Sequence, residues 1–178
     1  MNRYAVLVAV GPDRPGLVDA ISQFIFESGG NLEDSRMAVL GGEFAVLVLV
    51  SGAEGAVQRV LEGAEAAGRS IGLTMHARPT RSPGEAASTE TLPYELSAFA
   101  LDHPGIVTRV AHYLGEQHIN VRAMETRVAP APVSGQPLFS LHAVIDLPRG
   151  SSVRALRRDL DALGDVENID IELRPLKE

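Results

Sequence analysis

Residues 13–18 read Asp-Arg-Pro-Gly-Leu-Val, and residues 102–107, 89 positions later, read Asp-His-Pro-Gly-Ile-Val. Glu27 and Asn31 recur at the same spacing, as Glu116 and Asn120. Because self-similarity at a fixed spacing is the mark of a duplicated unit, the sequence predicts two similar halves.

A linker is expected between the halves. Residues 79–91 contain almost no large apolar side chain and carry Pro, Gly and Ser, a composition typical of linkers. The sequence therefore predicts a first domain over 1–78, a linker over 79–91 and a second domain over 92–178.

Hydrophobic periodicity predicts the same six elements, in the order βαββαβ, within each half. In the first half we expect strands at 4–10, 32–39, 44–50 and 71–77, a helix from 17 to the Gly29-Gly30 pair, and a helix through 57–64 that ends near Gly68. In the second half we expect strands at 94–100, 121–128, 138–145 and 166–173, and helices at 106–117 and 152–163. The first half has a tight turn at Gly41-Gly42, and residues 129–136 predict a longer, mobile loop in the second.

This element order predicts an α+β, ferredoxin-like fold. Right-handed crossovers place both helices on one face of an antiparallel sheet with strand order 4-1-3-2. Residues 5–10 and 45–50 are apolar on both faces, although helices cover only one. We therefore expect the other face to be covered by the partner half or by a second chain, with pseudo-symmetric packing of the halves and a homodimer.

The repeated loop has the chemistry of a zwitterion site. Proline suits a first helical turn, glycine permits close approach to the backbone, and the helix N-terminus beyond favours a carboxylate. Asp13 or Asp102 would take an ammonium group, and the amides of Asn31 and Asn120 both donate and accept hydrogen bonds. The alternative is structural: the aspartates cap helices and the asparagines occupy turns.

These motifs resemble the ACT domain family, and the tandem arrangement resembles a subfamily of transcriptional repressors. The resemblance implies regulatory modules that bind amino acids, with the loop of one domain facing the second strand of a paired domain. It implies that ligand-binding residues lie on one loop at Asp13, Arg14, Pro15, Gly16 and Leu17, on the other at Asp102, His103, Pro104, Gly105 and Ile106, and on paired strands at Asn31 and Asn120. Gly11 and Ala100 stand where some amino-acid-binding members have a histidine.

Composition excludes several other classes of protein. Lys plus Arg number 16 against 23 Asp plus Glu, and the net charge of −7 disfavours direct binding to nucleic acid or an anionic membrane. The chain has no cysteine, which excludes disulfides and Cys-type zinc sites and favours a reducing, cytoplasmic location. The apolar stretch at the N-terminus is too short to span a bilayer, and no histidine or carboxylate spacing predicts a metal, a cofactor or a catalytic site.

The expected function is therefore a non-enzymatic sensor of an amino acid such as glycine or serine. Through the resemblance, its partner would be a DNA-binding transcription factor. A dimerisation module without ligand remains an alternative, as does a small acylphosphatase-like hydrolase that uses Arg14.

Overall fold

The computed structural model describes residues 2–86, 91–132 and 134–176. The chain divides into two compact units, Met1–Ala87 and Ser88–Glu178, which we call domain 1 and domain 2. The division falls inside the segment predicted as a linker. The exact domain boundaries remain a prediction.

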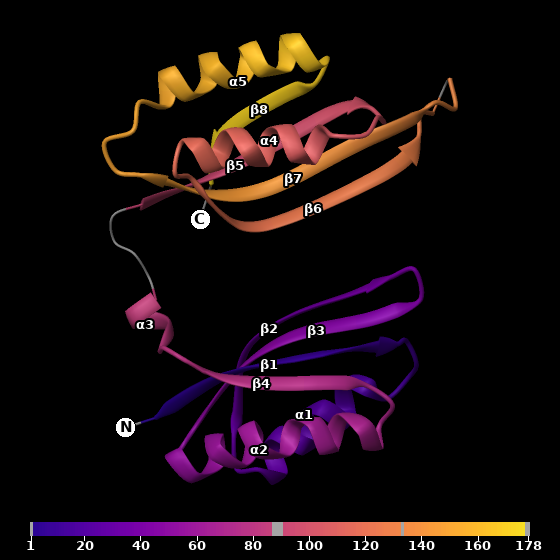
Figure 1. Ribbon diagram of the computed structural model, residues 1–178, viewed down its shortest axis with the longest axis vertical. Coiled ribbons are helices and arrows are strands. Elements are labelled where there is room, and N and C mark those ends of the chain that lie inside the picture. Colours follow the sequence, from indigo (N-terminus) through magenta and orange to yellow (C-terminus); the bar gives the residue numbers. More distant parts are fainter. Residues whose placement is uncertain (1, 87–90, 133, 177–178) are drawn as a thin grey trace. The chain divides into compact units, whose positions relative to one another are not determined.

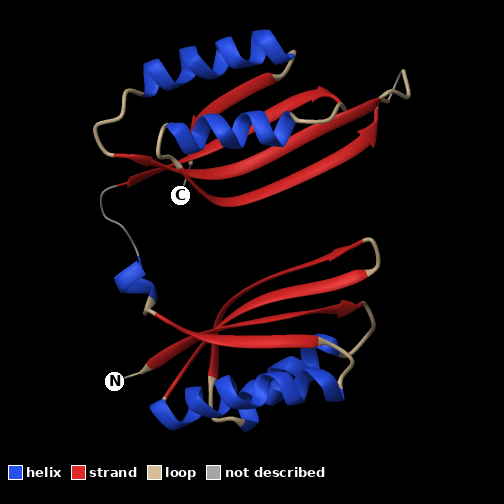
Figure 2. Ribbon diagram, in the orientation of Figure 1, coloured by secondary structure: helices blue, strands red, loops and turns tan. Residues whose placement is uncertain are grey.

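Domain 1 has the expected order of elements (Figure 1). They are β1 (Arg3–Pro12), α1 (Leu17–Glu27), β2 (Asn31–Leu40), β3 (Glu43–Gly52), α2 (Glu54–Ser70) and β4 (Thr74–Thr80), followed by the short helix α3 (Pro83–Ala86). Its sheet is antiparallel with strand order β2-β3-β1-β4, and α1 and α2 cover one face (Figure 2). The predicted strand order is confirmed.

Domain 2 repeats this arrangement. Its elements are β5 (Thr91–Leu101), α4 (Ile106–Glu116), β6 (Asn120–Pro130), β7 (Pro137–Pro148), α5 (Val153–Glu167) and β8 (Asp170–Pro175). The sheet order is β6-β7-β5-β8, again antiparallel with both helices on one face (Figure 2). The α+β, ferredoxin-like class is therefore confirmed in both halves.

The second helix of each domain is longer than the sequence suggested, so two predictions of strand position were wrong. Helix α2 continues to Ser70 and β4 occupies 74–80 rather than 71–77, while α5 continues to Glu167 and β8 begins at Asp170 rather than at 166. Gly68 does not stop α2; a Cβ there would lie 2.7 Å from the carbonyl oxygen of Leu73, so this glycine allows helix and strand to approach closely. Val166 is apolar but 77% exposed, so its apolar character wrongly indicated the start of the last strand.

Alternation along the central strands builds each core. In domain 1 the side chains of Leu7, Phe44 and Val48 are at most 1% exposed and pack beneath the helices with Ile21 and Ile25. In domain 2 the corresponding cluster contains Leu96, Leu141, Ile145, Val110 and Leu160. These positions face the helices, so the cores fix which face of each sheet is closed.

The opposite sheet faces, which we call the open faces, differ between the domains. In domain 1, Val8, Val10 and Leu47 lie on the open face with 40–48% of their side chains exposed. In domain 2, Ser97 and His142 occupy the positions of Val8 and Leu47 in the strand register. The prediction of apolar residues on both faces therefore holds for domain 1, the half on which it was based.

Candidate functional site

The loop between β1 and α1 is held against the β2–β3 turn. The backbone N–H of Asp13 donates to the carbonyl oxygen of Gly42 at 2.9 Å. Helix α1 begins at Leu17, and Gly16, with φ of 93°, is its N-cap residue without any side-chain cap. The alternative in which Asp13 caps the helix is therefore wrong, and Pro15 lies before the first turn rather than in it. The physical reason is that a left-handed glycine, not a side chain, turns the chain into the helix.

Domain 2 builds its loop in the same way. The N–H of Asp102 donates to the carbonyl oxygen of Pro137 at 2.9 Å, and Gly105, with φ of 103°, is the N-cap residue of α4, again without a side-chain cap. The helix-cap alternative is wrong for Asp102 too, and Pro104 also precedes the helix. The repeated loop thus has one geometry in both halves.

Space is open around both N-cap glycines. A Cβ added at Gly16 or Gly105 would meet no atom within 4 Å. The glycines are therefore needed for their positive φ rather than for a close approach to a neighbouring atom. By contrast, Leu17 and Ile106 are only 2% exposed, so they anchor the loops in the cores.

The second loop residue differs between the domains. In domain 1 the guanidinium of Arg14 donates to the carbonyl oxygen of Ile71 at 2.7 Å, at the end of α2. In domain 2 the ring Nδ1 of His103 lies 3.2 Å from the carbonyl oxygen of Pro104, a contact within the loop itself. Arg14, the residue that an acylphosphatase-like reaction would require, thus ties the loop to a helix end.

Asn31 lies in a hydrogen-bonded cluster at the start of β2. Its amide Nδ2 donates to Oε1 of Glu33 at 3.1 Å, and the hydroxyl of Ser51 donates to the same oxygen. These bonds, with that from Ser51 the larger cause, lower the pKa of the Glu33 carboxyl below its ordinary value. Ser51 is directly across the sheet from Asn31.

Asn120 occupies the same position in domain 2 with different partners. Its amide donates to Oδ2 of Asp146 at 3.3 Å, and the guanidinium of Arg122 binds both carboxylate oxygens of Asp146. Sequence analysis missed Glu33, Ser51, Arg122 and Asp146. Their common signal, the pattern Asn-x-(charged) after the first helix, is visible in the chain, but the partner across the sheet is not.

The structure does not bring the loop and the asparagine of one domain together. The loop lies beside the β2–β3 turn, whereas Asn31 lies at the other end of β2. At about 3.3 Å per residue, the two ends of this strand are roughly 30 Å apart. A single domain therefore does not hold both kinds of residue in one pocket.

A shallow hollow lies on the open face of domain 1. Its volume is about 90 Å³, and its lining residues are Val6, Asp34, Ser35, Arg36, Leu47 and Leu49. Asp34 and Arg36 form an ion pair of 2.5 Å with each other.

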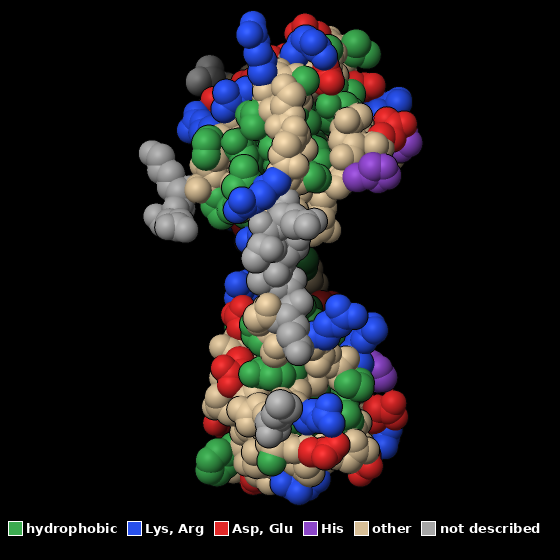
Figure 3. All heavy atoms as spheres, turned by 90° about the vertical axis from the view of Figure 1, so that its left-hand side faces the viewer, with side chains coloured by type: hydrophobic (Ala, Val, Ile, Leu, Met, Phe, Trp, Pro, Cys, Tyr) green, Lys and Arg blue, Asp and Glu red, His purple; other side chains and the backbone are tan. Residues whose placement is uncertain are grey.

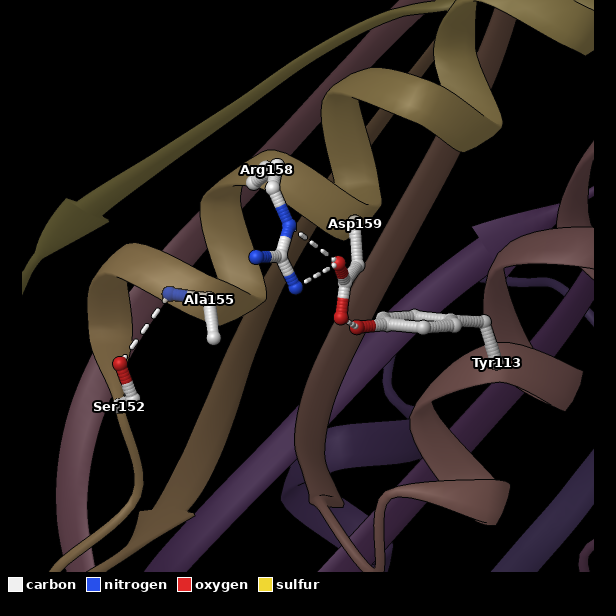
Figure 4. Close-up of polar contacts among 5 residues, drawn as sticks. All are labelled: Tyr113, Ser152, Ala155, Arg158 and Asp159. Atoms are coloured by element: carbon white, nitrogen blue, oxygen red, sulfur yellow. Dashed lines mark hydrogen bonds and ion pairs between the residues drawn. The ribbon is translucent and has the colours of Figure 1, made fainter.

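Asp159 and Asp161 both lie within helix α5. Asp159 accepts from the guanidinium of Arg158 at 2.9 Å and from the Tyr113 hydroxyl at 3.5 Å, so it links α5 to α4 (Figure 4). Burial, and then the Asp159 charge, raise the pKa of Tyr113 above its ordinary value. Figure 4 also shows the Ser152 hydroxyl, which accepts from the N–H of Ala155 at 3.2 Å and caps α5.

Metal clusters and membrane-spanning helices are both absent from the described part of the chain. Among residues 2–86, 91–132 and 134–176, no three or more His, Asp or Glu side chains come together as a metal site. Within the same residues, no helix has the length and apolar character needed to cross a membrane. On the faces drawn in Figure 3, basic side chains are interspersed with acidic ones.

Known proteins resemble this chain in sequence and in fold. The family model described as "ACT domain" matches residues 3–78. The glycine cleavage system transcriptional repressor of Escherichia coli is 28% identical over 181 residues, which cover 95% of this chain and 92% of the relative. A crystal structure of a protein of unknown function from Galdieria sulphuraria is 29% identical and matches with a TM-score of 0.81 over 99% of this chain and 100% of that one.

A structure that bears the name of the glycine cleavage system transcriptional repressor shows the same fold. It is 22% identical and matches with a TM-score of 0.73 over 100% of this chain and 99% of that one. The duplicated βαββαβ order and the repeated loop agree with these matches. Domain 1 matches the ACT domain family, and the chain is a tandem ACT-domain protein that resembles the glycine cleavage system transcriptional repressor over nearly its whole length.

Proposed function

We propose that this chain is a non-enzymatic regulator that binds an amino acid at its ACT domains and acts on transcription through a protein partner. The observation that carries the proposal is the repeated loop. In both domains the N-cap residue of the first helix is a glycine, so no side chain caps the helix, and a Cβ added at this glycine would meet no atom within 4 Å. Backbone N–H groups and the helix dipole favour a carboxylate there.

The loop aspartates would supply the other half of a zwitterion site. Neither Asp13 nor Asp102 is used as a helix cap, so each carboxylate is available to an ammonium group. The asparagine clusters would complete the pocket from a paired domain. We therefore propose Asp13, Arg14, Pro15, Gly16 and Leu17, with Asp102, His103, Pro104, Gly105 and Ile106, as the two loop half-sites and Asn31 and Asn120 as the strand half-sites.

The proposed partner is a DNA-binding transcription factor rather than DNA. The net charge of −7 repels a polyanion, and the relative from Escherichia coli is named a transcriptional repressor. A ligand that prefers one arrangement of the domains would shift its population by its differential affinity, typically about 1–3 kcal/mol. We further propose a cytoplasmic homodimer.

Calorimetric titration with glycine, serine and the other amino acids tests ligand binding. Saturable binding is expected for the wild-type chain. Asp13→Ala, Asp102→Ala, Asn31→Ala and Asn120→Ala are then compared, and the variants that lose binding identify which half supplies each part of the pocket. Asp161→Ala, on the exposed side of α5, is the matched control and should bind as the wild type does. No binding of any amino acid at millimolar concentration would instead favour the dimerisation module.

A second measurement tests the choice of partner. The isolated protein should not bind DNA at physiological salt, whereas a complex with its transcription factor should respond to the amino acid. DNA binding by the isolated chain, with an affinity that falls steeply as salt rises, would contradict the proposal.

A further inference from the structure

The residues around Asn31 and Asn120, the strand half-sites of the two domains, carry different charges. Both β2 and β6 contain an irregularity just after the asparagine, between Leu32 and Asp34 and between Val121 and Ala123. The residue inside the bulge is Glu33 in domain 1 and Arg122 in domain 2. An extra residue in a strand redirects its neighbours' side chains, and in both domains the bulge residue reaches the side chain across from the asparagine.

In domain 1 this arrangement orients a carboxylate without neutralising it. Both donors, Asn31 and Ser51, bind the same oxygen of Glu33 and are themselves uncharged. Among the described residues, no Lys, Arg or His forms an ion pair with Glu33. Glu33 is exposed, and its charge is held in one place by two hydrogen bonds. Such a group is suited to a charge-assisted bond with an incoming cation.

In domain 2 the carboxylate of the cluster lies on the facing strand and already has its cation. Asp146 lies across from Asn120, as Ser51 lies across from Asn31, and it is 13% exposed. Arg122 binds both of its oxygens in the planar, two-bond geometry that arginine makes with carboxylates. The cluster is neutral overall and offers no unpaired negative charge.

We infer that Glu33 is the ammonium-binding residue of the domain 1 strand half-site, and that the domain 2 half-site lacks this function because Arg122 neutralises Asp146. The inference rests on the proposed function. It makes a primary amine a required feature of the ligand bound through domain 1, and it predicts one tightly bound amino acid per chain rather than two.

Paired ligands isolate the contribution of the amine. Glycine and acetate share a carboxylate, and only glycine carries an ammonium group. In calorimetric titrations at pH 7, Glu33→Gln should weaken glycine binding about 10- to 100-fold, the size expected for one charge-assisted hydrogen bond. Acetate binding should not change. Glu62→Gln, which alters an exposed carboxyl on α2, is the control and should leave both ligands unaffected.

A gain of binding provides the converse test. Arg122→Gln frees the Asp146 carboxylate beside Asn120 and should add a second glycine site per chain. Arg122→Lys keeps a positive charge beside Asp146 and should retain the wild-type stoichiometry. A circular dichroism melt of each variant establishes that it is folded before titration.

The outcomes separate this inference from the proposed function. If wild type binds glycine and Glu33→Gln binds it equally well, the inference is overturned and the amino-acid sensor stands. Two equally tight glycine sites in the wild-type chain would also overturn the inference alone. If wild type binds no amino acid, the proposed function falls and takes the inference with it.

Discussion

Domains 1 and 2 have the same topology and the same loop geometry, yet their open faces and strand half-sites differ. On the open face of domain 1, Val8 lies across from Leu47. At the same positions in domain 2, the Ser97 hydroxyl lies 3.2 Å from Nδ1 of His142, whose ring meets Phe99 edge-on at 5.5 Å. Since the helices bury only one side of each sheet, the fold requires apolar residues only there, and the open faces are free to acquire different chemistry.

The half-sites follow the same rule. Asn31 and Asn120 keep their place and their cross-strand position, while the charges around them change from Glu33 with Ser51 to Arg122 with Asp146. Both arrangements satisfy the asparagine amide. Two halves that fold alike therefore need not bind alike.

The largest expected effect is the loss of stability when a side chain on the buried face of a sheet is shortened, compared with one on the open face. Leu7→Ala, or Leu96→Ala in domain 2, removes a fully buried side chain and should lower the free energy of unfolding by about 2–5 kcal/mol. Leu47→Ala, at a residue 48% exposed, should cost under about 1 kcal/mol. Urea denaturation measures both. Equal losses for Leu7→Ala and Leu47→Ala would mean that the open face of domain 1 is covered in solution.

A feature common to both domains is the close approach of the second helix to the last strand. A Cβ at Gly164 would lie 2.3 Å from the Ile169 carbonyl oxygen, and one at Gly68 would lie 2.7 Å from that of Leu73. Gly164→Ala and Gly68→Ala should each destabilise by about 1–3 kcal/mol, the former more. The matched control is Gly115→Ala in α4, where a Cβ meets no atom within 4 Å. Higher helix propensity there should stabilise by up to about 1 kcal/mol, and thermal melts would show a Tm that rises for this variant alone.

A smaller effect should distinguish the β1–α1 loop of domain 1 from the β5–α4 loop of domain 2. Arg14→Ala removes the hydrogen bond to Ile71 and should cost about 0.5 kcal/mol, because the bond is exposed. The amide of Asp13, which donates to the carbonyl oxygen of Gly42, should then exchange its hydrogen faster. His103→Ala removes no bond between elements and should leave hydrogen exchange at the Asp102 amide unchanged. Equal acceleration in both loops would show that Arg14 does not hold its loop in place.

The smallest effect concerns the pH dependence of Glu33. Its pKa is lowered in the folded state, so its contribution to stability is present above the pKa of the unfolded chain and is lost as pH falls through the folded value. Ser51→Ala should raise the Glu33 pKa toward its ordinary value, and Asn31→Ala should raise it less, since the Ser51 bond is the larger cause. Carboxyl-carbon NMR titration measures each pKa. The opposite order would refute this account of the cluster.

The sequence by itself determined the duplication, the βαββαβ order, the strand order and the loops that repeat. Periodicity and turn residues are local signals, and in this chain they agree along both halves, at 5–10 and 17–25 as well as at 94–100 and 106–114. The ends of α2 and α5 were placed too early because a glycine inside a helix looks like a stop until its packing is known.

Only the tertiary structure decided what the candidate residues contact. The Asn31–Glu33–Ser51 cluster depends on the register of β2 against β3 and on a bulge, and it joins residues 18 positions apart along the chain. The pairing of Arg122 with Asp146 spans 24 positions in the same way. Likewise, glycines rather than the aspartates of the structural alternative occupy the N-cap positions, because backbone φ, not residue type alone, fixed where the helices begin. Strand register, bulges and backbone dihedral angles are set when the chain folds. They determine which charged groups lie beside a candidate residue, and the residue types alone do not predict this.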